Sequence, residues 1–487
     1  MTAKIRIFWR LLCSRIILTV CQGMGNFDEY LNHLKELALR NKNLDAALKE
    51  LLSKYESMDT DTQYQALIKE FGLDDSMRKN QADVVRFKMA SMIYVSVLGF
   101  EKLSKVPDAQ SQIDDLDEIY ILISDIAAKY NLCKIPTIGD NMLLAGGVLK
   151  PSKTSPIDAV CAACEIMYEV GKLKETSDSI WDLSIGIHTG PALGRFAGKR
   201  QIPYTLSGNN ALIASRLGSA AEAGHTIISM MTYELVKEFF DMQKIGIMPV
   251  KYNGVMDTYL LNGIEKSLKV GDSPIEWGPK FKLIYRRMQF LDIQEEVLDM
   301  LETKLPKNLY YHNVKHTIDV TTEVELIGWA EGLSEEDVQL LKVAGLFHDT
   351  GHIMKYSGHE ECSCEIAADM LPKFNYTPEE IEKIRRIIMA TKLPHVPADK
   401  LEAVIQDSDL DYLGRSDFIP VSNLLYQELK ERNMIGTIDE WNKMQLAFIG
   451  KHQYFTQTAT SLREVNKQNQ IERIEQLLNK SESEAAD

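Results

Sequence analysis

The chain has 487 residues, enough for about two to four domains, and its 45% hydrophobic and 26% charged residues are typical of a folded protein. A formal net charge of −15 argues against a nucleic-acid surface, although a metal or a local cluster could still hold a small phosphate ligand. The seven cysteines do not form a disulfide framework in a chain of this length. We interpret Cys161, Cys164, Cys362 and Cys364 as small buried residues, with metal or redox use of the CxxC pair as the alternative.

Residues 5–21 are the segment that could direct the chain to a membrane, because basic residues precede apolar ones as in a signal peptide. Arg10 and Arg15 interrupt the apolar run, which falls short of the ~18 residues that a spanning helix needs. Met24 opens a stretch, MGNFDEYLNHL, that suits the start of a soluble protein. We therefore favour the interpretation that the start codon has been placed too early and that residues 1–23 are not translated. We expect a cytoplasmic protein without membrane contact.

An N-terminal helical region is predicted over residues 1–87. Leu31, Leu34, Leu44 and Leu48 follow helical spacing, but Asn41-Lys42-Asn43 breaks the pattern before it becomes a coiled coil. Either this region is a helix pair that packs on the next domain, or it is a dimerising signalling helix.

Residues 88–263 alternate strand and helix patterns with short glycine-rich turns, which predicts an α/β domain. The expected strands include MIYVSVLGF, KIPTIGD, NMLLAGGVL, LSIGIHTG, HTIISM and MDTYLL. Helices are expected over 113–130, about 156–173, ASRLGSAAEAG and TYELVKEFF.

A second, all-α domain is predicted over residues 280–478, where helical periodicity runs almost unbroken. Residues 264–279 contain glycine and proline and are interpreted as a linker, and residues 479–487 as a polar tail. The predicted fold class is therefore multidomain, with an α/β domain followed by an all-α domain.

Six of the ten histidines lie between residues 312 and 395, beside acidic residues. His312 and His316 share a helix face, His348 and Asp349 can both reach an ion over a helix edge, and Asp409 would arrive from a later helix. A single histidine on an apolar helix is usually a core residue, but this clustering favours a metal site. Imidazoles and carboxylates suit Mn²⁺, Fe²⁺ or Zn²⁺, and such an ion activates water toward a phosphoryl group while an uncoordinated histidine protonates the leaving oxygen.

The order YHNxxH, then HD, then a later Asp followed by Leu, resembles the HD superfamily of metal-dependent phosphohydrolases, and the YHN form is similar to that of cyclic-nucleotide phosphodiesterases. The resemblance spans the second domain, including FTQTATSLREVNKQNQIERI. The family includes nucleotidases, cyclic-nucleotide phosphodiesterases and nucleotide triphosphohydrolases, so the resemblance leaves the substrate open.

Residue roles follow from this resemblance by motif position. It implies four metal ligands, His316, His348, Asp349 and Asp409, and a general acid, His312. It also implies that His352 and His359, and more weakly His395, serve a second metal or the phosphate. Asp407 and Asp411 are expected to support Asp409 or to face solvent.

The stretches TIGDNMLLAGG, SIGIHTGPALGRFAG, YTLSGNNALIASRL and TYLL resemble class III adenylyl/guanylyl cyclase catalytic domains over about residues 88–262. The resemblance implies a ferredoxin-like domain that acts as a dimer, with sites built across the interface. It also implies two Asp residues for two Mg²⁺ ions, a base-reading residue and an Asn/Arg pair at the transition state.

Four of six functional cyclase positions are changed in this chain. The retained residues are Asp140, at the second metal position, and Arg216; the changed positions hold Ser96, Pro136, Leu212 and Asn253. One carboxylate cannot easily hold two divalent ions, and a leucine cannot bind a developing oxyanion. We favour a cyclase-like domain without cyclase activity; the alternatives are residual activity, or activity rescued by an intact cyclase partner.

The favoured functional hypothesis is a metal-dependent phosphohydrolase acting on a nucleotide or cyclic nucleotide. Its cyclase-like domain would serve dimerisation or nucleotide-responsive regulation in signalling. The alternative is a divergent adenylate or guanylate cyclase that uses Mg²⁺ and carries an accessory HD domain; a signalling scaffold with two inactive halves is a third option. The expected partners are a nucleotide and a second copy of the chain, without nucleic acid.

Overall fold

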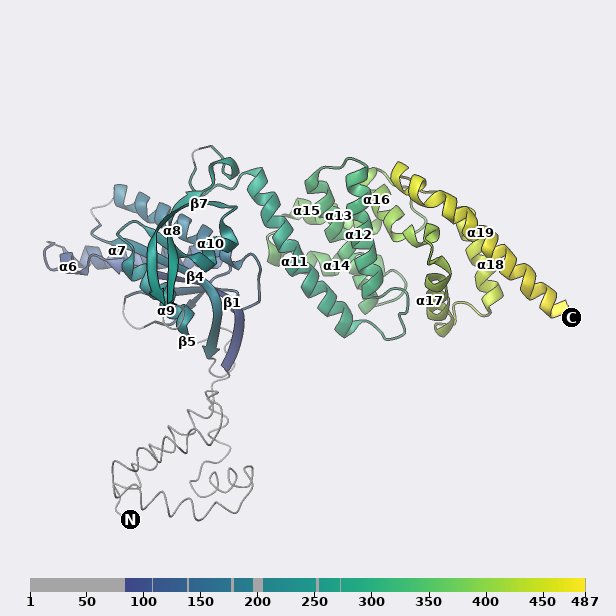
Figure 1. Ribbon diagram of the computed structural model, residues 1–487, viewed down its shortest axis with the longest axis horizontal. Coiled ribbons are helices and arrows are strands. Elements are labelled where there is room, and N and C mark those ends of the chain that lie inside the picture. Colours follow the sequence, from purple (N-terminus) through teal and green to yellow (C-terminus); the bar gives the residue numbers. More distant parts are fainter. Residues whose placement is uncertain are drawn as a thin grey trace, which may run out of the picture. The chain divides into compact units, whose positions relative to one another are not determined.

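The computed structural model describes residues 84–486 except Pro107, 138–139, 177–178, 196–204, 251–253 and Asp272. The predictions for residues 1–23, for nearly all of the N-terminal region 1–87, and for Asn253 lie outside the described residues. Among the described helices, none is long and apolar enough to cross a membrane. A sheet domain with flanking helices is followed by an all-helical region (Figure 1), which confirms the predicted fold class.

The first domain is built on a mixed sheet of eight strands within the described residues. The strand order is β2-β3-β1-β4-β6-β8-β7, and β5 pairs with β4 off this path. β1 and β3 are antiparallel, whereas β4 and β6 are parallel. The strands are β1 (Val84–Leu98), β2 (Cys133–Ile135), β3 (Met142–Gly146), β4 (Asp182–Arg195), β5 (Thr205–Ser207), β6 (Thr226–Ser229), β7 (Phe240–Val250) and β8 (Gly254–Ile264).

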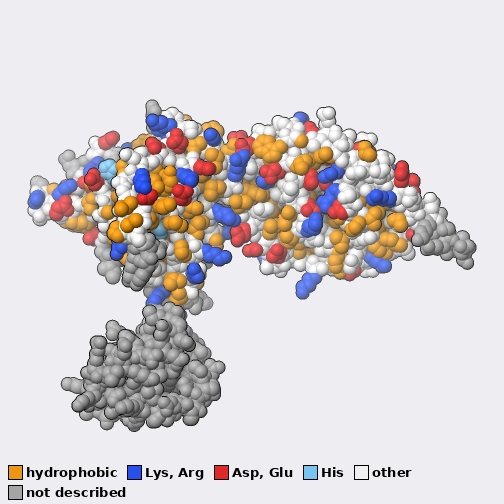
Figure 2. Space-filling model, in the orientation of Figure 1, with side chains coloured by type: hydrophobic (Ala, Val, Ile, Leu, Met, Phe, Trp, Pro, Cys, Tyr) orange, Lys and Arg blue, Asp and Glu red, His pale blue; other side chains and the backbone are white. Residues whose placement is uncertain are grey.

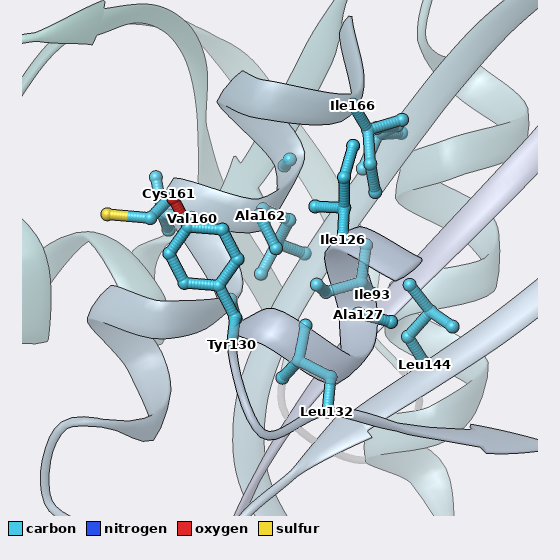
Figure 3. Packing of buried hydrophobic residues seen from close by; sticks show 14 of the residues in the cluster. Ile93, Ile126, Ala127, Tyr130, Leu132, Leu144, Val160, Cys161, Ala162 and Ile166 are labelled. Carbon is cyan, nitrogen blue, oxygen red and sulfur yellow. The ribbon is translucent and has the colours of Figure 1, made fainter. Parts of the chain in front are cut away.

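Two long helices, α7 (Ala109–Lys129) and α8 (Ser155–Thr176), supply most of the apolar side chains that pack on this sheet. Figure 3 shows Ile126 of α7 close to Ile93 of β1, and Val160 of α8 and Leu144 of β3 belong to the same buried cluster. These side chains are buried because α7 repeats its apolar residues at helical spacing and the strand residues face one side of the sheet. The shorter helices are α6 (Phe100–Leu103), α9 (Asn209–Ala220) and α10 (Met230–Val236).

Two local predictions differ from the structure. The helix expected over TYELVKEFF ends at Val236, and the unpredicted strand β7 begins at Phe240. The reason is that the rings of Phe239 and Phe240 both pack against the ring of Phe281. The segment interpreted as a linker is also ordered: Trp277 stacks on Phe281, and the buried Leu268 accepts a backbone hydrogen bond from Gly278.

The helical region begins with α11 (Pro279–Lys304), which contributes side chains to two hydrophobic cores. Phe281 and Tyr285 belong to the core of the sheet domain, whereas Phe290 and Ile293 begin the core of the helical region. The last helix, α19 (Gln457–Ala486), includes most of the expected polar tail. The other helices are α12 (Val314–Ala330), α13 (Glu335–Phe347), α14 (His359–Met370), α15 (Pro378–Met389), α16 (Lys400–Asp409), α17 (Phe418–Glu431) and α18 (Ile438–Ile449), with 3₁₀ turns η1 (Lys266–Leu268), η2 (Thr350–Ile353), η3 (Leu371–Phe374) and η4 (Asp411–Gly414).

The surface mixes charges of both signs. Figure 2 shows Lys and Arg side chains interspersed with Asp and Glu over the visible face of the described residues. Nucleic-acid binding needs a continuous basic patch, and that face does not present one.

The contact between β4 and α9 depends on glycine. A Cβ on Gly186 would lie 2.1 Å from the backbone nitrogen of Gly218 and 2.4 Å from the carbonyl oxygen of Ala214. We predict that Gly186→Ala lowers the free energy of unfolding by about 1–3 kcal/mol, measured by urea titration, because the backbones must separate. Gly171→Ala is the matched control: its Cβ would meet nothing within 4 Å, and alanine should stabilise the helix by about 0.5–1 kcal/mol. Equal stability of the two variants would contradict this packing.

Candidate metal centre

Four chain segments meet at the histidine cluster of the helical region. His316 lies in the first turn of α12, and His348 and Asp349 directly follow α13. Asp409 is the last residue of α16, and His359 is the first residue of α14. The side chain of Asn313 caps α12 by accepting hydrogen bonds from the amides of Lys315 and His316, so the Asn of YHN fixes where this helix begins.

Four side-chain atoms from these segments converge closely. His316 Nε2 lies 3.1 Å from Asp409 Oδ1, 3.3 Å from His348 Nε2 and 3.4 Å from Asp349 Oδ2. His348 Nε2 lies 3.3 Å from Asp349 Oδ2 and 3.5 Å from Asp409 Oδ1. Ligand bonds of about 2.0–2.2 Å separate neighbouring ligand atoms by about 3.0–3.5 Å, so these spacings fit a shared ion.

His348 is oriented as a metal ligand requires. It is fully buried, and its Nδ1 donates a hydrogen bond of 2.7 Å to the carbonyl oxygen of Gly345, which leaves the lone pair on Nε2 facing the cluster. Burial disfavours a charged imidazole, but Asp349 and Asp409 outweigh it and raise the pKa of His348 well above its usual value. The cluster therefore attracts positive charge.

A second group of ligand atoms faces the other oxygen of Asp349. His359 Nε2 lies 3.2 Å from Asp349 Oδ1, and the rings of His352 and His359 stack with centroids 3.8 Å apart. His312, Asp349 and His352 also bring one ligand atom each within 4.8 Å of one another. Burial lowers the pKa of His352 to about 3, so this histidine is neutral and can offer a lone pair. Asp349 thus lies between two histidine groups, an arrangement that suits one ion or two.

Buried atoms without partners test whether these residues fit a metal. Among the described residues, no hydrogen-bond partner is found for Asp349 Oδ2 or for either ring nitrogen of His352. Such groups destabilise a fold unless something compensates them. A divalent ion would compensate them, and the nitrogen and oxygen donors are those that Mn²⁺, Fe²⁺ and Zn²⁺ accept.

A carboxylate that the sequence analysis missed supports His312. Glu428 of α17 is fully buried and accepts hydrogen bonds from Nδ1 of His312, from the amides of Tyr311 and His312, and from the hydroxyl of Tyr356. Burial opposes its ionisation, but the bonds from His312 outweigh burial and lower the pKa of Glu428 to about 2. With Nδ1 of His312 bound in this way, Nε2 is the ring nitrogen left for a substrate. Glu428 lies 116 residues from His312 in a helix without a recognisable motif, so no sequence signal pointed to it.

The remaining predicted residues of this half lie outside both groups. His395 binds the buried Glu402 through a contact of 2.8 Å. Asp407 is buried and accepts hydrogen bonds from the amides of Phe455 and Thr456, so it does not face solvent. Asp411 is buried too and pairs with Arg463.

The cysteine pairs stay apart from the metal ligands within the described residues, because no cysteine joins either group. Burial raises the pKa of Cys164 to about 12 and that of Cys364 to about 11, so these thiols resist ionisation.

The cyclase-like positions form a different kind of site. Ser96 on β1 is buried, and its hydroxyl has no hydrogen-bond partner among the described residues. Asp140 precedes β3, which pairs with β1, and is exposed. Arg216 and Leu212, both exposed, come from α9, and Pro136 is exposed after β2. The two predicted metal positions of the cyclase-like domain thus hold one exposed carboxylate and one buried neutral hydroxyl.

Comparison with protein families identifies both halves. Residues 83–263 match the family model for the adenylate and guanylate cyclase catalytic domain, and residues 313–413 match the model for the HD domain. The chain therefore contains a cyclase catalytic domain of that family followed by an HD domain, which confirms both resemblances.

Two similar proteins match the cyclase half of the chain. An adenylate cyclase of Mycobacterium tuberculosis (strain ATCC 25618 / H37Rv) is 25% identical over 187 residues, which cover 38% of this chain and 42% of that protein. Guanylate cyclase 2G of Mus musculus is 23% identical over 248 residues, 49% of this chain and 22% of that protein. The match thus spans less than half the length of either relative.

Two solved structures align with the same part of the chain. The catalytic core of a rhodopsin-guanylyl cyclase with converted specificity, in complex with ATPalphaS, is 24% identical with a TM-score of 0.33 over 38% of this chain and all of that one. The adenylyl cyclase CyaB from P. aeruginosa is 25% identical with a TM-score of 0.35, covering 38% of this chain and 99% of that one.

We predict that His316→Ala loses bound metal and that His395→Ala does not. Removing one ligand should weaken metal binding by about 100-fold or more, whereas His395 lies outside both ligand groups. Metal analysis of each purified full-length variant after gel filtration measures this difference. Equal metal content in His316→Ala and the unchanged protein would contradict the assigned centre.

Proposed function

We propose that the HD domain is a metal-dependent phosphohydrolase that cleaves a nucleotide or cyclic nucleotide. The observation that carries this proposal is the convergence of His316, His348, Asp349 and Asp409 within 3.1–3.5 Å contacts, with a buried oxygen of Asp349 left without a partner. These four residues would hold one divalent ion, Mn²⁺, Fe²⁺ or Zn²⁺. His352 and His359 would serve a second ion or the phosphate.

The chain's own residues supply the proton chemistry. When bound, a divalent ion supplies Lewis acidity toward a phosphoryl group and toward water. Hydrolysis joins a water oxygen to phosphorus and breaks the bond to the leaving oxygen, which takes a proton from Nε2 of His312. The attacking water gives up a proton to solvent, and His312 takes one back from solvent before the next turnover. Glu428 holds the other ring nitrogen and fixes the direction in which His312 presents that proton.

We assign the cyclase-like domain to dimerisation or to nucleotide-responsive regulation of the HD domain in signalling. Ser96 and Leu212 stand where the cyclase resemblance implies a metal carboxylate and an oxyanion donor, which argues against a complete cyclase site in a homodimer. Exposed apolar side chains of this domain, such as Leu212, Met231 and Ile247, are consistent with a surface that a second copy covers.

A nucleotide panel tests the hydrolase. We predict that the purified chain with Mn²⁺ or Fe²⁺ hydrolyses at least one cyclic or linear nucleotide, and that Asp349→Asn reduces turnover by about 1000-fold or more because one side chain faces both ligand groups. Phosphate or nucleoside monophosphate release is the measurement. Activity that survives Asp349→Asn would refute the assignment.

Glu428→Gln separates proton transfer from metal binding in the same assay. Turnover should fall about 10–100-fold while metal content stays unchanged, because His312 loses its carboxylate partner. Glu431→Gln is the control: this glutamate lies on the same helix and accepts an exposed hydrogen bond from the hydroxyl of Tyr310 instead.

The alternative function is a divergent cyclase, favoured by the retained Asp140 and Arg216 and by relatives named as cyclases. We predict that the full-length chain with Mg²⁺ releases no pyrophosphate from ATP, GTP, CTP or UTP. Release that disappears in Asp140→Ala would instead establish the cyclase.

A further inference from the structure

A cavity lies between α11, α12 and α13 in the helical region. Its volume is about 370 Å³, within the range of about 300–1,000 Å³ that small-molecule sites occupy. Each helix presents one face to it; α11, for example, contributes Arg287, Leu291 and Gln294 at spacings of four and three residues. Figure 1 shows the three helices next to one another.

This cavity is separate from the metal centre. On α12 the cavity is lined by Glu325, nine residues after the ligand His316, which places the two side chains about half a turn apart on opposite faces. No residue of the two histidine groups lines the cavity. A molecule bound here would therefore not be the one positioned for hydrolysis.

Carboxamides in the lining point to a polar ligand. Gln339 of α13 is 8% exposed and lines the cavity, so its amide lies at the wall in a largely enclosed position. A ligand with matching donors and acceptors can exchange hydrogen bonds with such a group, and hydrogen bonds made in an enclosed site favour binding. Gln294 lines the cavity from α11 and offers a second carboxamide.

Aromatic and cationic groups complete the lining. Trp329 of α12 is 44% exposed and lines the cavity, leaving indole surface available for stacking. The ammonium of Lys342 lies 4.8 Å from the ring centroid of the buried Phe290 and 2.7 Å from Glu325, which holds it at the wall. Arg287, paired with Glu335, supplies a second cation.

We propose that this cavity binds a purine nucleotide carrying one phosphate. The flat base stacks on Trp329, the carboxamides of Gln339 and Gln294 bond to its edge, and the phosphate meets Lys342 and Arg287. A 5′-monophosphate and a 3′,5′-cyclic phosphate share this chemistry. The proposal does not rest on the hydrolase activity, because the binding groups lie outside the metal centre.

Titration of the full-length, metal-loaded protein with AMP, GMP and cyclic AMP tests the site. We expect saturable binding by calorimetry, accompanied by a change in tryptophan fluorescence that Trp329→Phe removes. Gln339→Leu and Lys342→Met should each weaken binding by about tenfold or more, because each removes a direct contact. Tighter binding of AMP than of cyclic AMP identifies the linear form as the ligand, and the reverse order identifies the cyclic form.

Lys383→Met is the matched control, since this lysine of α15 likewise pairs with an acid, Asp337 of α13, but does not line the cavity. It should bind the nucleotides as the unchanged protein does. The proposal is overturned if no probe binds at millimolar concentration, or if binding survives Gln339→Leu and Lys342→Met. Loss of binding in Asp409→Asn alone would also overturn it, by placing the ligand at the metal centre. A failed hydrolase assay leaves these results unaffected, so the two proposals fail separately.

Discussion

The helical region is organised around one buried carboxylate. Asp349 is only 6% exposed, and its two oxygens face different histidine groups, with His316 and His348 on one side and His359 on the other. An isolated buried charge is costly, so the surrounding imidazoles are needed for the fold as well as for any chemistry. Burial disfavours the ionised carboxyl, yet His348 outweighs burial and holds the pKa of Asp349 well below its usual value.

This requirement explains details that apolar packing alone would not. Between Asp349 and His359 the chain passes so close to itself that a Cβ on Gly351 would lie 1.9 Å from the carbonyl oxygen of His359, so only glycine fits. Ser363 ties the same turn together by donating to the carbonyl oxygen of His348 and accepting from the amide of Gly351. The HDTGH sequence is therefore a turn as much as a ligand set, and the turn delivers His352 and His359 to the second oxygen of Asp349.

The sequence predicted the parts of the molecule that carry local patterns. Apolar residues that repeat with a period of 2 or 3.6 predicted the α/β domain and the all-α domain. Closely spaced histidines and acidic residues predicted the metal site. Strand β7 was missed because FDMQKIGIMPV mixes Gly246 and Pro249 with few alternating apolar residues, and pairs only with β8 among the described strands. Glu428 was missed for a different reason: the sequence alone does not distinguish a buried glutamate in a helix from a solvent-exposed one. His395 was chosen on residue type alone, and the structure pairs it with Glu402, so its role as a ligand stays a prediction.

The histidine cluster of the helical region and the predicted metal positions of the sheet domain differ in buried charge. In the helical region, carboxylates and imidazoles are held together at ligand spacing, and buried atoms are left for an ion to satisfy. In the sheet domain, Ser96 of β1 is buried and neutral, and Asp140, which precedes the strand paired with β1, is exposed, so neither of these two positions buries a carboxylate that a metal would have to offset. A buried position that holds a neutral side chain needs no metal to balance its charge. This contrast is the physical basis of the proposed division of roles, in which hydrolytic chemistry is assigned to the helical region and assembly or sensing to the sheet domain.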